Sequence, residues 1–393
     1  MKRLLGLLLV MVGCEGGTNV NEEPVTVAEP DPSRIGAAET AKEVSSHQDV
    51  PGHTAAELAN LTNQVIRNEK GEVLHVDLEE HDFGDVEMAQ LAGFTQLETL
   101  NLIRTQVTDV GLWRIREFNR LEMLFLDGTQ ITDTGLESLK AMSGLEVLHL
   151  SDTRLNGTGL IFLEGMNKLR GLHLAKTQVT DNGLAHLNGL TRLQSLSLKG
   201  TRITDAGLIH LREMTAMDHL DLTNTSIRGT GSVYLSELNG LRELYLNKSQ
   251  LTDAGLAHLK RLRNLQTLRI SDTQITDAGL VHLKEMPRLE KLWIRNVPIT
   301  DSGLSHLKAM KQLRVLWIGD ARVSTITDAG LVHLRGLTRL YKLLLEAPQV
   351  TDAGLVHLEA MRRLDMLDLE ATQVTDAGVA KLHQILPKCS INH

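Results

Sequence analysis

Apolar residues return along most of the chain in a fixed block of 24 positions. In the copy that begins at Leu121, apolar residues stand at positions 121, 124 and 126, and the same spacing recurs from Leu145 and Leu169. The first part of each block alternates apolar and other residues, as a short strand does, and the second part has helical spacing. The thirteen copies begin at Val73, Leu97, Leu121, Leu145, Leu169, Leu193, Met217, Leu241, Leu265, Leu289, Leu313, Leu340 and Leu364.

Each copy reads approximately L-x-x-L-x-L-x-x-T-x-[IV]-T-D-x-G-L-x-x-L-x-x-[ML]. Thr132 and Asp133 stand where a helix would begin, and their side-chain oxygens can accept the free N–H groups of a first turn. Gly135 permits close approach at that point. The alternation of strand and short helix predicts an α/β solenoid, with a parallel sheet on one side and helices on the other. Because helices are wider than strands, we expect the sheet to be the concave face.

These residues resemble the leucine-rich-repeat family over residues 73–386, and the T-D-A-G-L-x-H-L segments are similar to tandem repeats of bacterial surface and periplasmic proteins of the planctomycete type. More distantly they resemble ribonuclease-inhibitor-like and F-box-associated repeats. The resemblance implies a curved horseshoe that binds other molecules. Threonine stands where the family has an asparagine, and we expect its hydroxyl to bond to the backbone at the bend and form a ladder between copies. These threonines are Thr105, Thr129, Thr153, Thr177, Thr201, Thr225, Thr273 and Thr372.

The first residues have the features of an export signal. Lys2 and Arg3 precede an apolar stretch, and the segment that ends at Cys14 resembles the lipobox of bacterial lipoproteins, although Met11 stands where leucine is usual. Acylation of Cys14 would anchor the protein at the periplasmic or cell-surface side of a membrane; the alternative is an ordinary cleaved signal in which Cys14 is incidental. The predicted organisation is a signal and anchor in 1–14, a disordered tether in 15–53, an amphipathic capping helix in 54–72, repeats in 73–386 and a C-terminal cap in 387–393.

Composition and motifs exclude several classes of function. A formal net charge of −8 argues against nucleic-acid binding, which requires a basic surface. Cys14 and Cys389 make no disulfide framework, and we expect Cys389 to be a small buried apolar residue. The repeat period accounts for nearly every residue and leaves no nucleophile, phosphate-loop or zinc motif. We therefore expect no catalytic site, cofactor or metal.

Three residue types recur in step with the repeats. A histidine row on the helical segments could bind metal or sense pH, but single imidazoles one repeat apart lack convergent ligands, and duplication of a surface residue explains them. The aspartates are predicted to cap helices rather than to bind calcium, and the methionines to fill one inward slot. The histidines are His186, His210, His258, His282, His306, His333 and His357; the aspartates are Asp109, Asp133, Asp181, Asp205, Asp253, Asp277, Asp301, Asp328, Asp352 and Asp376; the methionines are Met142, Met166, Met214, Met286, Met310 and Met361.

The repeats lose their uniformity in the copies that begin at Leu289, Leu313 and Leu340. The threonine becomes Val297, Ala321 and Pro348, and an insertion, Arg322 to Thr325, falls in the same stretch. At the outward position of the predicted strands, Trp293 and Trp317 fall on adjacent strands, roughly 5 Å apart. Aromatic and arginine side chains are typical of interface hot spots. The candidate ligand-binding residues are Tyr245, Arg269, Lys291, Trp293, Arg295, Arg314, Trp317 and Leu344; without a ligand, the indoles would merely stack on each other and on arginine stems.

The pattern favours a non-enzymatic, membrane-tethered module that recognises a protein or peptide on its concave face. A glycan is the alternative partner, because adjacent tryptophans also stack on sugar rings. An F-box-like adaptor would require a helical F-box ahead of the repeats, whereas residues 15–72 offer one short helix and a polar segment. An enzyme would need a site made wholly from repeat residues.

Overall fold

The computed structural model describes residues 65–320, 322 and 324–393. The predicted signal, the anchor Cys14, the tether and residues 54–64 of the predicted capping helix lie outside the described residues, as do Ala321 and Val323.

The described residues form one sheet of fifteen strands, in which each strand pairs with the next along the chain. β1 is antiparallel to β2, and all the following pairs are parallel. The strands are β1 (Val65–Arg67), β2 (Val73–Asp77), β3 (Thr99–Asn101), β4 (Met123–Phe125), β5 (Val147–His149), β6 (Gly171–His173), β7 (Ser195–Ser197), β8 (His219–Asp221), β9 (Glu243–Tyr245), β10 (Thr267–Arg269), β11 (Lys291–Arg295), β12 (Val315–Gly319), β13 (Lys342–Glu346), β14 (Met366–Asp368) and β15 (Ser390–Asn392).

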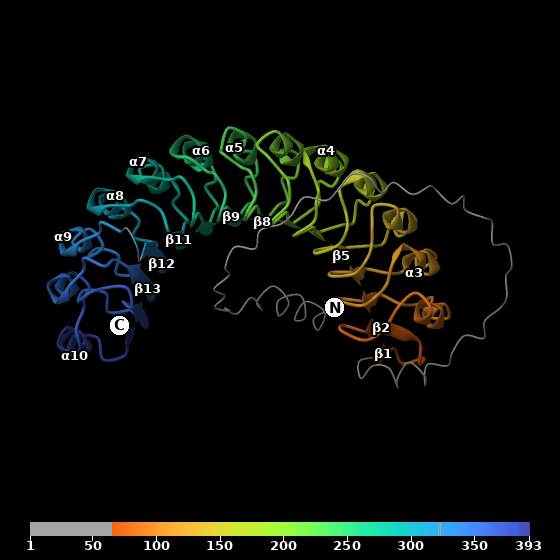
Figure 1. Cartoon of the computed structure of the whole chain (residues 1–393), viewed down its shortest axis with the longest axis horizontal. Coiled ribbons are helices and arrows are strands. Elements are labelled where there is room, and N and C mark those ends of the chain that lie inside the picture. Colours follow the sequence, from red (N-terminus) through yellow and green to blue (C-terminus); the bar gives the residue numbers. More distant parts are fainter. Residues whose placement is uncertain (1–64, 321, 323) are drawn as a thin grey trace, which may run out of the picture. The chain divides into compact units, whose positions relative to one another are not determined.

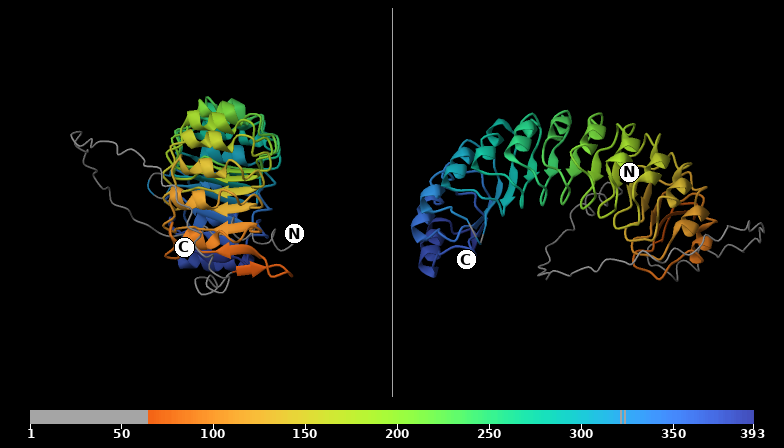
Figure 2. Two further views of the ribbon diagram at one scale, coloured as in Figure 1. Left: turned by 90° about the vertical axis from the view of Figure 1, so that its right-hand side faces the viewer. Right: turned by 45° about the horizontal axis from the view of Figure 1, so that its top comes forward.

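Short helices follow the strands and cover the opposite side of the repeat unit. Figure 1 shows the strands along the inner side of the arc of repeats and the helices along its outer side, and Figure 2 shows the same layers from two further directions. The fold therefore confirms the predicted solenoid with a concave parallel sheet. The α-helices are α3 (Asp109–Arg114), α4 (Asp181–Leu184), α5 (Ser232–Leu235), α6 (Asp253–Leu259), α7 (Asp277–Leu280), α8 (Asp301–Leu307), α9 (Asp328–Leu331) and α10 (Asp376–Ile385), and the 3-10 helices are η1 (Glu87–Leu91), η2 (Gly135–Leu139), η3 (Thr158–Leu163), η4 (Ala185–Leu187), η5 (Gly207–Leu211), η6 (Leu283–Glu285) and η7 (Asp352–His357).

The core is a continuous aliphatic stack between the sheet and the helices. The three strand leucines of the copy at Leu121 are 0% exposed, and the predicted methionine slot is buried in all six copies that carry it. Burial of this apolar surface against neighbouring copies is the main favourable term in a solenoid, because no copy can bury its leucines alone.

The N-terminal end of the sheet differs from the predicted helix. Val65–Arg67 form β1, which turns at Gly71 (φ 82°) and pairs antiparallel with β2. The helix prediction is wrong for these residues, because the first parallel strand would otherwise present an unpaired row of N–H and C=O groups. The β-branched Val65 and Ile66 suit the extended pairing.

The C-terminal end of the repeats is closed by one more strand. β15 extends the sheet parallel to β14, and Leu386 and Cys389 are buried beside it. Burial raises the pKa of the Cys389 thiol to about 11, which keeps it protonated and unreactive at neutral pH. The prediction of Cys389 as a buried apolar residue is confirmed.

The aspartates of the T-D-x-G segments link neighbouring copies. Asp277 Oδ1 accepts the backbone N–H of Thr300 at 2.9 Å, and Oδ2 accepts its hydroxyl at 2.6 Å. The threonine oxygen in turn accepts the N–H of Ser302 and caps its own helix, α8. The predicted role of the aspartate is wrong, because only the threonine caps the helix of its own copy. The aspartate instead holds the capping threonine of the next copy. The same bonds join Asp85, Asp109, Asp181, Asp253, Asp301, Asp328 and Asp352 to the following threonine.

The glycine of the T-D-x-G segment leaves room for the aspartate of the preceding copy. A Cβ at Gly303 would collide with Oδ1 of Asp277, and a Cβ at Gly135 would collide with Oδ1 of Asp109. Glycine therefore allows the carboxylate of one copy to approach the helix start of the next, as the sequence predicted for Gly135.

The threonine at the bend closes a turn within its own copy. Thr105 donates its hydroxyl hydrogen to the carbonyl of Leu102 at 2.8 Å, and Thr129 donates to Leu126 at 2.6 Å. The predicted ladder between copies is wrong for these hydroxyls, since the acceptor is three residues earlier in the chain. Links between copies at this level come instead from the backbone, as in the bond from the N–H of Leu102 to the carbonyl of Phe125.

Candidate functional site

The outward residues of consecutive strands form one column across the concave sheet. The strand register pairs Tyr245 with Arg269 and Arg269 with Trp293. It then pairs Trp293 with Trp317 and Trp317 with Leu344. The sheet therefore brings together the central residues of the predicted ligand-binding set in the order that the sequence indicated.

Arg269 lies between two aromatic rings. Its guanidinium carbon is 4.1 Å from the ring centroid of Tyr245 and 4.7 Å from that of Trp293. Both distances are within the range of cation–π attraction. On the far side of Tyr245, the phenol donates to Glu243 Oε2 at 2.7 Å, and burial raises the pKa of the Tyr245 hydroxyl.

Arg295 and Trp317 form a second pair of guanidinium and ring, and this one includes a carboxylate. The guanidinium carbon of Arg295 is 5.2 Å from the centroid of Trp317, and its Nε is 2.6 Å from Glu346 Oε1. Trp317 donates its indole N–H to the same oxygen at 3.1 Å. Gly319 lies between Arg295 and Glu346 in the strand register, so no side chain separates them.

Glu346 was missed by the sequence reasoning. Only 15% of its side chain is exposed, and its second oxygen is buried without a hydrogen-bond partner. The sequence does contain a signal for Glu346. In a strand of five residues such as β13, positions 342, 344 and 346 lie on the same outward face, so Glu346 follows Leu344 on that face. In β11, β12 and β13 the strands run for five residues, whereas their neighbours β10 and β14 run for three. The lengthening coincides with the copies in which the turn threonine is replaced.

The remaining candidates occupy the margin of this group. Lys291 is half-buried in β11, and Leu344 is half-buried beside Trp317. Arg314 directly precedes β12, where it lies 3.4 Å from Glu290 and over the ring of Tyr341. Its partners are thus side chains at the start of the strands and not the indoles.

Both indoles are half-buried, whereas the sequence predicts rings that stand in water. Their partners differ from a simple stack of two tryptophans, because Arg269 covers Trp293 and Arg295 covers Trp317. The cluster formed by Tyr245, Arg269, Trp293, Arg295, Trp317, Leu344 and Glu346 is called the aromatic–arginine cluster below.

Comparisons with known proteins agree with this fold. The family model described as leucine-rich repeat matches residues 261–283. An internalin from Listeria monocytogenes superposes with a TM-score of 0.61 at 25% identity, covering 78% of this chain and 88% of that one. A leucine-rich-repeat protein of Leptospira interrogans superposes with a TM-score of 0.59 at 18% identity, covering 81% and 83%.

The fold is a leucine-rich-repeat solenoid. A plant peptide hormone receptor, RGFR1, solved in complex with RGF2, shares the fold with a TM-score of 0.51 at 17% identity, covering 76% of this chain and 48% of the receptor. No curated protein matches the chain significantly.

A second aromatic group lies in the same column nearer the N-terminus. Phe125 meets His149 edge to face with ring centroids 4.8 Å apart, and His149 stacks on His173 at 4.0 Å. Nδ1 of His149 lies 3.0 Å from Asp127. Burial lowers the pKa of His173 to about 3, so its ring is neutral at physiological pH. Phe125, His149 and His173 are called the aromatic–imidazole stack below.

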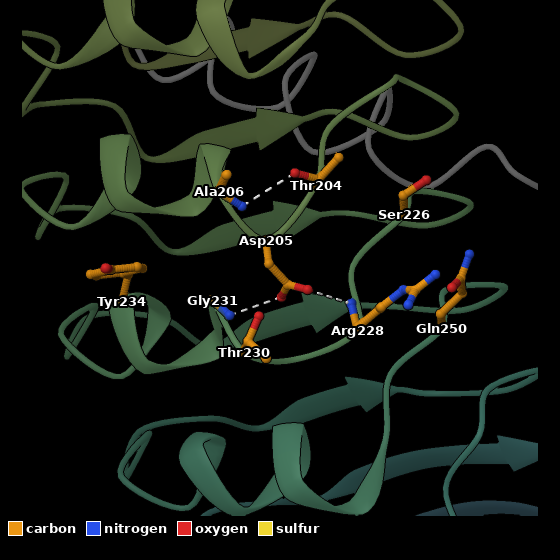
Figure 3. Close-up of a pocket in the computed structure, with 9 residues that line it drawn as sticks. All are labelled: Thr204, Asp205, Ala206, Ser226, Arg228, Thr230, Gly231, Tyr234 and Gln250. Atoms are coloured by element: carbon orange, nitrogen blue, oxygen red, sulfur yellow. Dashed lines mark hydrogen bonds between the residues drawn. The ribbon is translucent and has the colours of Figure 1, made fainter.

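A pocket of about 670 Å³ lies where one copy loses the Thr-Asp cap. Asp205 accepts the backbone N–H groups of Arg228, Gly229 and Gly231, which replace the usual threonine. Figure 3 shows the side chain of Arg228 on one side of this lining and that of Tyr234 on the other. The polar groups do not converge and the carboxylate is already occupied, so we assign no ligand to this pocket.

Residues 65–320, 322 and 324–393 contain neither a metal-ligating cluster nor a membrane-spanning helix. No group of three or more His, Cys, Asp or Glu side chains in that part could hold a metal ion. None of the helices found there combines the length and apolar character needed to cross a bilayer. In the predicted histidine row, His186 contacts Glu164 at 2.8 Å, an ordinary surface pairing between neighbouring copies.

Proposed function

We propose that this protein is a non-enzymatic recognition module that binds a peptide or a peptide segment of a protein at the aromatic–arginine cluster. The observation that carries the proposal is the aligned, half-buried row of aromatic rings and guanidinium groups on the concave sheet. Such residues supply large contact area at low entropic cost and are enriched in binding hot spots. The RGFR1 and RGF2 complex, in which a chain of the same fold is solved with a peptide hormone, supports a peptide as partner.

A peptide fits the cluster better than a glycan. A sugar ring requires a free indole face, whereas guanidinium groups contact the rings of Trp293 and Trp317. A peptide can use the edges of the rings together with the polar groups between them. We therefore place the glycan second.

The test is selection of peptides on the full chain from a displayed heptapeptide library, followed by affinity measurement with the selected synthetic peptides. Trp293→Ala combined with Trp317→Ala should weaken binding by about a thousandfold, since two hot-spot truncations at about 2 kcal/mol each total about 4 kcal/mol. Trp113→Ala is the matched control, because Trp113 is 57% exposed on α3, on the helix side of the repeats. Equal affinity of the double variant and wild type would disprove the proposal.

We also propose that the module is exported and held at the periplasmic or cell-surface side of a membrane through an acylated Cys14. The support is the positively charged, then apolar segment that precedes this cysteine, with Gly13 before it. Labelled palmitate should enter the wild-type chain and not Cys14→Ala; equal incorporation in both would refute the anchor.

A further inference from the structure

Two guanidinium groups of the aromatic–arginine cluster both contact aromatic rings but differ in their charge partners. Arg295 faces Trp317 and forms an ion pair with Glu346, with 2.6 Å between Nε and Oε1. Arg269 faces Tyr245 and Trp293, and no carboxylate of the described residues lies within ion-pair distance of it. One arrangement of ring, guanidinium and carboxylate is therefore complete within the chain, and the other lacks its carboxylate.

The polar atoms of Arg269 show which part of the group remains available. Its Nε is buried and has no hydrogen-bond partner, and the same is true of Nε of Arg295, whose contact with Glu346 is an ion pair. The two terminal nitrogens bond to no acceptor of the described residues, and neither of them is fully buried. A guanidinium that is fixed between two rings and has free terminal donors is preorganised for a planar anion, because little rotamer entropy remains to be lost.

The nearby acidic groups already have other partners. Glu243 lies one strand away, but it accepts from Tyr245 and contacts His219, and the hydrogen bond with His219 lowers the pKa of Glu243 to about 2. Lys291 adds a further cation in the next strand beside Trp293. The protein has a formal net charge of −8. Even so, the guanidinium of Arg269 forms no ion pair with a carboxylate of the described residues.

We propose that Arg269 binds a carboxylate of the partner, in a peptide whose apolar residues contact Trp293, Trp317 and Leu344. The inference rests on the proposed function and specifies its ligand as an acidic peptide. The carboxylate supplies the charge partner that Arg269 lacks, as Glu346 does for Arg295, but it reaches the terminal nitrogens and not the buried Nε. Tyr245 and Trp293 fix the plane of the guanidinium, so that its terminal nitrogens can donate to both carboxylate oxygens.

The experiment combines peptide selection with a double-mutant cycle on the full chain. Heptapeptides selected by the wild type should carry Asp or Glu at one position relative to an aromatic or aliphatic residue. Synthetic peptides with the acid replaced by its amide should bind the wild type about 10- to 100-fold more weakly, the range expected for a charge-assisted hydrogen bond. For Arg269→Gln the acidic and amide peptides should bind equally well, whereas Arg269→Lys should retain part of the preference.

Two controls separate the proposal from simpler effects. Arg170→Gln removes an arginine that already pairs with Glu146 in another part of the sheet, and the acidic preference should persist in it. Peptides with an amidated C-terminus distinguish a side-chain carboxylate from the chain terminus as the bound group. Circular dichroism confirms that each variant remains folded.

The outcomes distinguish failure of this inference from failure of the proposed function. If peptides bind through Trp293 and Trp317 but the change from acid to amide weakens binding equally in wild type and Arg269→Gln, Arg269 is not the carboxylate site while the recognition module stands. If the wild type selects no peptide whose binding depends on the two tryptophans, both proposals are overturned.

Discussion

The concave sheet carries two aromatic groups in one column, and they use the same backbone position in different ways. In the aromatic–imidazole stack, Phe125 is only 6% exposed, the histidine rings contact each other, and His149 has Asp127 as a polar partner. In the aromatic–arginine cluster the rings are half-buried and Arg269 has no acidic partner within the described residues. The difference teaches that an aromatic residue on the concave face is not in itself a binding residue. What distinguishes the two groups is whether the polar groups between the rings are already satisfied.

The charged residues at the start of the strands also differ between the aromatic–imidazole stack and the aromatic–arginine cluster. Beside the stack, the strand entries carry Glu98, Glu122 and Glu146, and burial together with the two neighbouring carboxylates raises the pKa of Glu122. Beside the cluster, the corresponding positions are Gln266, Glu290, Arg314 and Tyr341, where Glu290 is paired with Arg314, and Lys291 and Lys342 lie one residue further along their strands. An acidic peptide is therefore repelled from the first region and attracted to the second.

The largest effect expected from this comparison is on stability, in the aromatic–imidazole stack. Phe125→Ala should lower the free energy of unfolding by about 3 kcal/mol, because a buried phenyl ring loses both its transfer energy and its contacts. Trp293→Ala, at the equivalent position of a strand in the cluster, should cost about 1 kcal/mol, since its ring is half-buried. Urea unfolding followed by circular dichroism measures both. Similar losses at the two positions would remove the distinction between a packed and a recognition group.

A medium effect is expected when the internal carboxylate of the cluster is removed. Glu346→Gln takes away the charge that pairs with Arg295 and weakens the acceptor of the Trp317 indole, so the free energy of unfolding should fall by about 1–2 kcal/mol. The variant then presents a second guanidinium without an anion, and the affinity for acidic peptides should rise a few-fold at low salt. Both quantities are measured by urea unfolding and by peptide titration.

Glu290→Gln provides the matched control for that variant. Glu290 also pairs with an arginine, Arg314, but both side chains are at least 40% exposed and the pair is 3.4 Å apart. Its loss should cost less than about 0.5 kcal/mol. If Glu346→Gln is as mild as Glu290→Gln and leaves peptide affinity unchanged, Glu346 does not act as the internal anion of the cluster.

The sequence predicted the fold in detail because the repeat period determines it. One register, fixed by leucines every 24 residues, places each outward residue next to its counterpart in the neighbouring copy, so the adjacency of Trp293 and Trp317 followed from the sequence. The sequence did not show interactions that span copies through side chains. The local pattern predicts Asp277 as a cap of its own helix, whereas its partner in the structure, Thr300, is one repeat away.

Two parts of the candidate site escaped prediction for related physical reasons. Glu346 pairs with Arg295 across Gly319, two strands apart, and this reach depends on strands that extend beyond the usual three residues. The strand β1 is formed by tertiary pairing with the open edge of β2 and not by its own apolar spacing. In both cases long-range pairing decides a conformation that a local pattern cannot specify.

The smallest effect expected is a pH dependence that belongs to the aromatic–imidazole stack. The folded-state pKa of His173 is about 3, lowered first by burial and then by His149 and His219, against the opposing effect of Asp127. Between this value and about 6.5, the unfolded chain binds a proton that the folded chain does not, so stability falls as the pH decreases through that window. His173→Phe keeps a ring beside His149 without a titrating group, so its melting temperature should decline less than that of wild type between about pH 7 and about pH 5. The control, His258→Gln, changes an exposed imidazole and should follow the wild type. Parallel curves for wild type and His173→Phe would show that the buried imidazole does not contribute to the pH dependence.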